Sequence, residues 1–240
     1  MTRRVFLWSG PRNLSTALMY SFAQRGDTRV VDEPLYAHYL QRTPADAYHP
    51  AAAEVLDSME RDGERVIEAL LAPQPRPVLF AKHMTHHLVD LDLDFLDHTA
   101  NVLLTRDPVD MLPSYAAVVS EPTLDDVGYA AHIALLDHLR SRGREPIVLD
   151  ARQILLDPES VLRQLCGRLD IPWDPAMLSW EAGPRPEDGV WAPHWYASVH
   201  RSTGFGPYRP KPRVLPPDLQ ELGARCEPLY EQLRALAIQA

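Results

Sequence analysis

Short apolar runs alternate with longer amphipathic stretches over most of the chain. Five of these runs have the length and the continuous apolar character of strands that are buried on both faces. They occupy residues 5–8, 28–31, 78–81, 101–105 and 146–149. Because strands that alternate with helices form βαβ units, the pattern predicts an α/β fold. Its sheet is mainly parallel, with about five strands and helices on both faces in a three-layer arrangement.

The stretches between and after these runs have apolar residues at helical spacing. The predicted helices cover residues 14–24, 51–71, 124–142, 157–169 and 219–237. Another helix begins at Asp107 and Pro108, because aspartate is a good N-cap and proline is tolerated at the first helical position. The segment 35–50, which is rich in His, Tyr and Pro, is predicted to be a loop.

Residues 171–217 differ from the rest of the chain, because they are rich in Pro and Gly, contain most of the tryptophans and show little periodicity. We interpret them as an ordered cap over a binding site, and residues 218–240 as a closing helix. A length of 240 residues suits one large α/β core, so we predict that residues 1–240 form a single domain.

Composition and charge narrow the class of protein. Hydrophobic residues make up 45% and charged residues 24% of the chain, as in a globular protein. The net charge of −9 argues against general nucleic-acid binding, which depends on cations that neutralise phosphates. No apolar run approaches the length of a membrane span or of a signal peptide. We therefore expect a soluble cytoplasmic protein with neither nucleic-acid nor membrane partners.

Lysine and cysteine are both scarce. Lys82 and Lys211 are the two lysines of the chain, so arginine supplies almost all the positive charge, and a lysine beside a strand is a candidate for a special role. Cys166 and Cys226 have no metal-ligand or CxxC partner in the sequence, which predicts two reduced thiols.

The first predicted strand is followed by residues 9–16, with the sequence Ser-Gly-Pro-Arg-Asn-Leu-Ser-Thr, and then by a helix. The unpaired N–H groups and the dipole of a helix N-terminus favour a bound phosphate at such a loop. Arg12 can hold anionic oxygens in a bidentate manner, and Ser15 and Thr16 can donate hydroxyl hydrogen bonds. The alternative is an ordinary turn in which these two hydroxyl residues cap the helix.

Two well-known nucleotide loops do not match this segment. A Walker A loop that starts at Gly10 needs glycine and lysine where Ser15 and Thr16 stand, and the GxGxxG pattern is absent. An ATP-dependent kinase or nucleotide hydrolase is therefore disfavoured, although it stays as an alternative hypothesis.

A second candidate anion site follows the fourth predicted strand. Arg106 ends that strand, and Ser114 lies eight residues later on the helix that Pro108 opens. Eight residues are just over two helical turns, so both side chains can converge on one anion. In parallel sheets ligands bind outside the carboxyl ends of the strands, where this site and the loop 9–16 are expected to meet.

These two elements together resemble the sulfotransferases that use 3′-phosphoadenosine-5′-phosphosulfate (PAPS). Residues 12–16 are similar to the Lys-Ser-Gly-Thr-Thr loop of cytosolic sulfotransferases and the Arg-Ser-Gly-Ser-Thr loop of bacterial trehalose-type enzymes. Arg106 and Ser114 resemble the family's 3′-phosphate site. The segment 201–206, with Lys211 beyond it, loosely resembles the family's late basic loop over that phosphate.

The resemblance implies a P-loop-like fold and binding of PAPS, or of its product adenosine 3′,5′-bisphosphate (PAP), without a metal. The residues to which it assigns donor binding are Gly10, Pro11, Arg12, Asn13, Leu14, Ser15, Thr16, Arg106, Ser114, Arg201 and Gly204. Leu14 replaces the usual glycine, and Arg12 replaces the lysine of the cytosolic enzymes. These departures resemble a divergent bacterial-type branch with a Gly-Pro-Arg-Asn-Leu-Ser-Thr start, whose members are sometimes labelled by similarity to branched-chain aminotransferases.

Sulfuryl transfer needs a base for the acceptor and positive charge at the oxygen that leaves with the nucleotide. Glu33 follows the second strand, and the resemblance to trehalose-type enzymes implies that it is the base. The alternative is a turn, because acidic residues before proline are common in loops.

Residues 82–87, Lys-His-Met-Thr-His-His, resemble the Lys-Thr-His element that follows strand three in the cytosolic enzymes. The resemblance implies catalytic roles for Lys82 and His86, ahead of His83 and His87, although the spacing differs by one residue. Lys82 would stabilise the leaving oxygen, and Arg12 is the alternative for this role. The three histidines lack a fourth ligand with a recognisable spacing, so we predict no zinc site.

The leading hypothesis is a PAPS-dependent sulfotransferase that acts on a hydroxyl or amine of a small-molecule acceptor. Its rivals are a P-loop kinase or hydrolase and a non-catalytic relative that binds the nucleotide. The cap is expected to select the acceptor. The aromatic and histidine residues of the cap that can line an acceptor pocket are Trp191, His194, Trp195 and His200.

Overall fold

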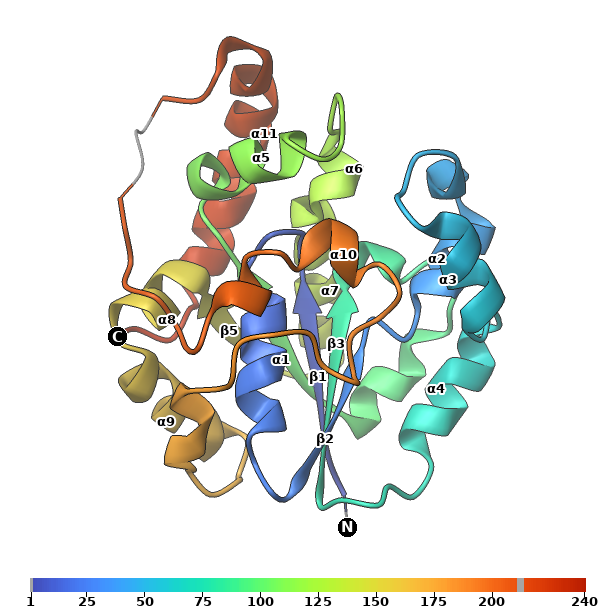
Figure 1. Cartoon of the computed structure of the whole chain (residues 1–240), viewed down its shortest axis with the longest axis vertical. Helices are drawn as coiled ribbons and strands as arrows, with labels where there is room; N and C mark the ends of the chain where they lie inside the picture. The colour runs from blue at the N-terminus through green and yellow to red at the C-terminus, as the bar shows by residue number, and fades with distance from the viewer. Residues whose placement is uncertain (1, 211–213) are drawn as a thin grey trace.

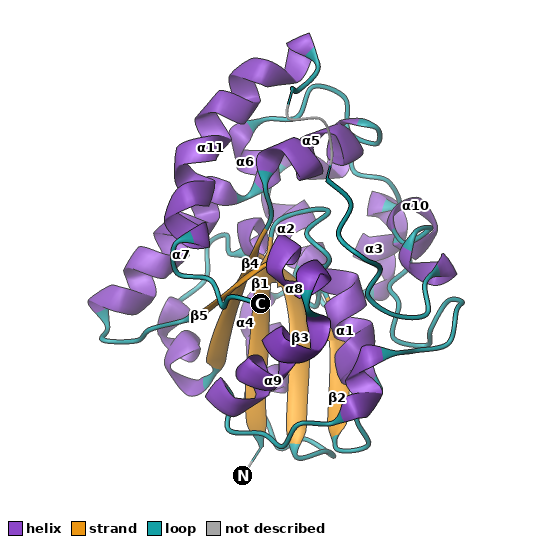
Figure 2. Cartoon of the chain, turned by 90° about the vertical axis from the view of Figure 1, so that its left-hand side faces the viewer, coloured by secondary structure: helices purple, strands orange, loops and turns teal. Residues whose placement is uncertain are grey.

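The computed structural model describes residues 2–210 and 214–240, so Lys211 lies outside the described residues. Five strands form one parallel sheet in the order β2-β3-β1-β4-β5, between two layers of helices (Figures 1 and 2). The strands are β1 Arg3–Ser9, β2 Thr28–Asp32, β3 Val78–Met84, β4 Ala100–Thr105 and β5 Ile147–Asp150. The predicted three-layer α/β fold, with five parallel strands, is therefore confirmed.

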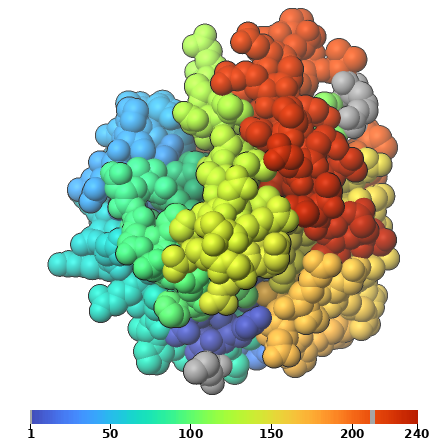
Figure 3. All heavy atoms as spheres, turned by 180° about the vertical axis from the view of Figure 1, so that it is seen from behind, coloured from blue at the N-terminus to red at the C-terminus, as the bar shows by residue number. Residues whose placement is uncertain are grey.

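Side chains of the central strand β1 alternate between the two helical layers, as the period of two in a strand requires. Val5 and Leu7 belong to the core cluster that contains helices α1 (Ser15–Ala23), α8 (Ala151–Leu156) and α9 (Pro158–Arg168). Phe6 and Trp8 belong to the opposite cluster. Its helices are α4 (Gly63–Leu71), α7 (Tyr129–Ser141) and α11 (Gln220–Arg234). Seen from behind, α11 lies beside α7 across the back of the molecule (Figure 3).

Two predicted helices are each divided in the structure. The prediction of one helix over 51–71 was wrong, because α3 (Ala52–Ser58) ends before Asp62, whose side chain accepts hydrogen bonds from the first N–H groups of α4. The prediction of one helix over 124–142 was also wrong. Gly128, with φ of +76°, separates α6 (Leu124–Val127) from α7.

Helices within the segment 35–50 and directly after the fifth strand were not predicted, and the third strand extends well beyond its predicted end. The segment 35–50 is not only a loop, because it contains α2 (Tyr36–Arg42) and a 3₁₀ helix, Pro44–Ala47. Most of α2 is buried, so it lacks the polar face that an amphipathic pattern needs. The short α8 directly follows β5. The third strand continues three residues past its predicted end, which places Lys82 and His83 on opposite faces of β3.

The segment 171–217 contains little regular structure. Its elements are the 3₁₀ helices Pro175–Leu178 and Val199–Arg201, the short helix α10 (Ala192–Trp195), and the start of the 3₁₀ helix Pro217–Leu219. It crosses the front of the molecule near the carboxyl ends of β1 and β3, where α10 lies above the sheet (Figure 1). Helix α5 (Pro108–Ala116) begins at the predicted cap, because the Asp107 side chain accepts a hydrogen bond from the Val109 N–H group.

Candidate active site

The loop between β1 and α1 has an unusual backbone. Arg12 and Leu14 have φ values of +58° and +77°, although neither is glycine. Leu14 is the N-cap residue of α1, and no side chain of the described residues caps this helix. Strained backbone of this kind occurs where the surrounding structure holds a functional loop. The hydroxyls of Ser15 and Thr16 therefore do not cap the helix N-terminus. The alternative prediction from the sequence, an ordinary turn capped by these two residues, is wrong.

Neighbouring elements hold the loop in place. The Asn13 side-chain amide donates to the carbonyl oxygen of Leu104 at 3.1 Å, which ties the loop to β4. A Cβ atom added at Gly10 would lie 2.8 Å from the carbonyl oxygen of Val127. Glycine at this position is therefore required by close packing of the loop against the end of α6.

Gly10→Ala is expected to lower the free energy of unfolding by about 1–3 kcal/mol, because a backbone oxygen cannot move away as a side chain would. Urea unfolding followed by circular dichroism measures this change. Gly167→Ala is the matched control, since among residues 2–210 and 214–240 no heavy atom outside its chain neighbours and the adjacent backbone of helix α9 lies within 4 Å of the added Cβ. That control should raise stability by about 0.5–1 kcal/mol, and equal effects of both variants would contradict the close-packing argument.

The two predicted anion elements are in direct contact. Arg12 Nε donates to Ser114 Oγ at 3.0 Å, and Arg106 Nη1 donates to the carbonyl oxygen of Arg12 at 2.7 Å. Burial, together with the nearby charge of Arg106, lowers the pKa of the Arg12 guanidinium. Two adjacent guanidinium groups beside an uncapped helix N-terminus can attract an anion.

A cavity of about 410 Å³ lies at this loop, within the size range of pockets for small molecules and cofactors. Eleven of the predicted site residues line it: Pro11, Arg12, Asn13, Leu14, Ser15, Thr16, Glu33, Lys82, His86, Arg106 and Ser114. The carboxyl ends of β1, β2, β3 and β4 therefore contribute to one site, as expected for a parallel sheet.

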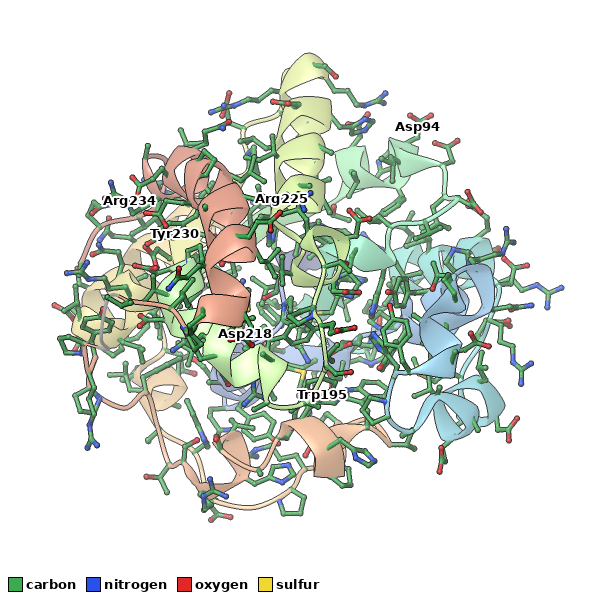
Figure 4. The ribbon with its side chains drawn as sticks, turned by 90° about the horizontal axis from the view of Figure 1, so that it is seen from above. Asp94, Trp195, Asp218, Arg225, Tyr230 and Arg234 are labelled. Atoms are coloured by element: carbon green, nitrogen blue, oxygen red, sulfur yellow. The ribbon has the colours of Figure 1, made fainter. Side chains whose placement is uncertain are left out.

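The cap forms one wall of the cavity through Trp191, Trp195, Tyr196, Ser198, Val199 and Ser202. The Trp195 carbonyl oxygen accepts a hydrogen bond of 2.8 Å from Arg12 Nη1. The indole ring of Trp195 stacks on the Tyr115 ring, with 6.1 Å between ring centroids. From above, Trp195 lies between α10 and α5 (Figure 4).

Two residues predicted to bind the donor besides Gly10, namely Arg201 and Gly204, and the cap histidines His194 and His200 do not line this cavity. Gly10 packs against the carbonyl oxygen of Val127. Arg201 is exposed, and Gly204 forms an isolated antiparallel bridge with Ser179. His194 is exposed, and His200 Nε2 lies 2.9 Å from an oxygen of Asp188.

A buried cluster of charges lies under the cavity. Lys82 Nζ is 2.7 Å from Asp32 Oδ1, 2.8 Å from Glu33 Oε1 and 2.5 Å from Tyr196 Oη. The register of β2 and β3 places Asp32 directly beside Lys82. The sequence indicated Lys82 and Glu33, but it missed Asp32 and Tyr196. A carboxylate at the end of a strand next to the lysine strand is the signal that would have identified Asp32.

The ionisation of this cluster follows from burial and charge. Burial raises the pKa of Glu33, Lys82 opposes this effect, and the Asp32 charge adds to it, so the pKa lies above its ordinary value. Burial alone would lower the pKa of Lys82, but the two carboxylates outweigh it and raise the pKa. Lys82 is therefore a cation, and Glu33 is a stronger base than a solvated glutamate.

The three histidines of residues 82–87 have different surroundings. His86 lines the cavity, whereas His83 lies on the opposite face of β3, where its ring stacks on Trp8 at 4.3 Å between centroids. His87 lies between the rings of Tyr36 and Tyr39, at 5.0 and 4.6 Å. Burial is the main reason that the pKa of both His83 and His86 falls to about 3, so both are neutral near pH 7.

Within residues 2–210 and 214–240, no group of three or more His, Cys, Asp or Glu side chains is placed to hold a metal ion. Among the same residues, every helix is too short or too polar to span a bilayer.

Two related plant proteins are longer than this chain. The chain is 43% identical over 230 residues to branched-chain-amino-acid aminotransferase-like protein 1 of Arabidopsis thaliana. It is 40% identical over 232 residues to branched-chain-amino-acid aminotransferase-like protein 2 of the same organism. The matches cover 95% and 96% of this chain but 41% of each relative, so the chain spans less than half of their length.

Solved structures share the fold at low sequence identity. The sulfotransferase domain from the curacin biosynthetic pathway matches with a TM-score of 0.55 and 16% identity, over 95% of this chain and 98% of that domain. A sulfotransferase from Alicyclobacillus acidocaldarius matches with a TM-score of 0.56 and 14% identity, over 100% and 98% of the two chains. The family model described as a sulfotransferase domain matches residues 3–237. This chain therefore belongs to the sulfotransferase family.

Proposed function

We propose that this protein transfers a sulfuryl group from PAPS to a hydroxyl or amine of a small-molecule acceptor. One observation carries the proposal: Arg12, Arg106 and Ser114 meet at the uncapped N-terminus of α1, in the same cavity as the buried carboxyl group of Glu33. A cationic cradle beside a base is the arrangement that sulfuryl transfer requires.

The 5′-phosphosulfate is proposed to bind at residues 11–16, and the 3′-phosphate at Arg106 and Ser114. Glu33 accepts the acceptor proton as the acceptor oxygen or nitrogen attacks sulfur. The new bond to sulfur forms while the bond from sulfur to the bridging oxygen breaks. The electron pair of the broken bond goes to the 5′-phosphate of PAP, beside the Arg12 guanidinium.

The ionisation of the two candidate bases favours Glu33 over His86. A general base works best when its pKa lies near the operating pH. Burial moves the Glu33 pKa upward, towards that range, and moves the His86 pKa down to about 3, away from it. We therefore assign His86 to the wall of the cavity, where its ring lies 5.1 Å from that of Tyr39 between centroids.

Calorimetric titration with PAP tests the donor site. We expect micromolar binding by the wild-type protein. Arg106→Ala should weaken it about 10- to 100-fold, because it removes a charge-assisted hydrogen bond to phosphate. Arg168→Ala, at an exposed position on α9 that does not line the cavity, is the control and should leave the affinity unchanged.

Two results would overturn the donor assignment. One is the absence of wild-type binding at micromolar PAP. The other is magnesium-dependent binding of ATP in preference to PAP, which would favour the kinase or hydrolase hypothesis. PAP binding without turnover of any acceptor would instead favour a non-catalytic relative.

A further inference from the structure

The hydrogen bonds of Lys82 leave it no donor for a ligand. A lysine ammonium group has three N–H donors and no acceptor. All three point to partners within hydrogen-bond distance, in Asp32, Glu33 and Tyr196. The Lys82 side chain is 0% exposed, although it borders the cavity. A bond from Lys82 to the leaving oxygen of a donor would require one of these three buried bonds to break.

Tyr196 completes this arrangement from the cap. Its oxygen accepts hydrogen bonds from Lys82 Nζ and, at 3.0 Å, from Trp191 Nε1, which are both donors only. Its single hydroxyl hydrogen is donated to Asp32 Oδ2 at 2.7 Å. The backbone N–H of Gly189 also donates to Asp32 Oδ2, at 3.4 Å. Hydrogen bonds of Tyr196 and Gly189 thus join the cap to Asp32 at the end of β2 and to Lys82 near the end of β3.

The same cluster holds Glu33 in a strained backbone conformation. Glu33 has a φ value of +41°, and its N–H donates to the Lys82 carbonyl oxygen at 2.8 Å. The Lys82 ammonium group binds Oε1, one of the two carboxylate oxygens. Both the backbone and the side chain of Glu33 are therefore fixed by the residue beside it on β3.

We infer that Lys82, Asp32 and Tyr196 are positioning residues that hold Glu33 towards the acceptor, and that Lys82 does not contact the leaving oxygen. The inference rests on the proposed function for the role of Glu33. It assigns to the cap a part in the catalytic centre itself, because Tyr196 supplies one of the three partners of Lys82. Stabilisation of the charge on the leaving oxygen is then assigned to Arg12, which also lines the cavity.

The two lysines of the chain allow a direct test. In a Lys211→Arg background, ¹⁵N-lysine labelling gives a single side-chain signal, that of Lys82. A buried ammonium group with three partners is expected to exchange its hydrogens slowly and to give a protected NH₃⁺ resonance. Saturation with PAP should leave this resonance in place, because the bound phosphate does not replace a partner of Lys82.

Tyr196→Phe is expected to abolish the protected resonance, because the ammonium group loses one acceptor, while PAP affinity stays within about twofold of wild type. Tyr48→Phe is the matched control, since Tyr48 donates to Asp126 at the surface and does not contact Lys82. A resonance that survives in Tyr196→Phe would overturn the network. A resonance that shifts strongly or disappears on PAP binding would overturn the positioning role and assign Lys82 to the phosphate.

These outcomes separate the inference from the proposed function. If the wild-type protein does not bind PAP, the donor assignment fails. The NH₃⁺ resonance of Lys82 and its loss in Tyr196→Phe then still report on the network, because neither measurement needs a ligand.

Discussion

Lys82→Met is expected to lower the free energy of unfolding by about 3–5 kcal/mol, the usual cost of removing one partner from a buried ion pair. The variant leaves the carboxyl groups of Asp32 and Glu33 buried without their cation. Methionine is similar to lysine in length and fills the space of the aliphatic stem. The loss is therefore electrostatic and does not come from a cavity.

The destabilisation by Lys82→Met should also depend on pH. Burial raises the Glu33 pKa in the folded protein, and removal of Lys82 removes the main opposing effect. A carboxyl group with a raised pKa binds its proton more tightly in the folded state, so stability is lost as pH rises through that pKa. The deficit of the variant should accordingly be larger at about pH 8 than at about pH 5.

Urea unfolding at several pH values measures both effects. Arg163→Met is the control, because Arg163 forms a half-exposed pair with Glu159 on α9. Such surface pairs contribute less than about 1 kcal/mol. Addition of Asp32→Asn to Lys82→Met should recover part of the lost stability, since it removes one uncompensated charge. A Lys82→Met deficit no larger than that of the control would mean that water reaches these carboxyl groups.

The contact between the two candidate anion elements could be predicted from sequence because the residues of each element are close together in the chain. Arg12, Ser15 and Thr16 lie within one strand-loop-helix unit, and Arg106 and Ser114 lie within another. The rule that parallel strands present their carboxyl ends at one edge was enough to bring both units together. In the structure the two strand-loop-helix units are in contact through the Arg12–Ser114 and Arg106–Arg12 hydrogen bonds.

The charge cluster could be predicted only in part, because its geometry is not local. Glu33 and Lys82 were selected through resemblance, but the partner of Lys82 depends on the register of β2 and β3, which places Asp32 beside it. Tyr196 lies 164 residues after Asp32 in a segment without periodicity, so no pattern indicates where its hydroxyl group points. The same lack of pattern explains why Arg201 was assigned to the site on a loose resemblance alone.

The divided helices and the missed helix α2 have a different cause. Hydrophobic spacing alone does not detect a single residue that begins a new helix, such as the N-cap Asp62 or the N-cap Gly128 with its positive φ. Helix α2 is buried around most of its circumference, so burial against the cap and α3 hides the helical period. Packing decides both outcomes, and packing is known only once the elements are assembled.

Glu33→Gln is expected to reduce turnover by about 10²- to 10⁴-fold, the usual contribution of a general base, while PAP binding is retained. Glutamine has the shape of glutamate and cannot accept the proton of the acceptor. It also lacks the negative charge that burial opposes at this position, so the variant is expected to fold. Lys82 keeps Asp32 as an anionic partner.

Mass spectrometry of sulfated product, with PAPS and an acceptor identified by screening, measures the turnover of Glu33→Gln. Wild-type turnover should rise with pH through the raised Glu33 pKa, because the base acts only when it is deprotonated, and this rise should be absent from the residual activity of the variant. Glu181→Gln, at an exposed position in the cap, is the control and should match wild type. If Glu33→Gln keeps more than a tenth of wild-type turnover with the same pH dependence, the proton is accepted by another group, and His86 becomes the next residue to replace.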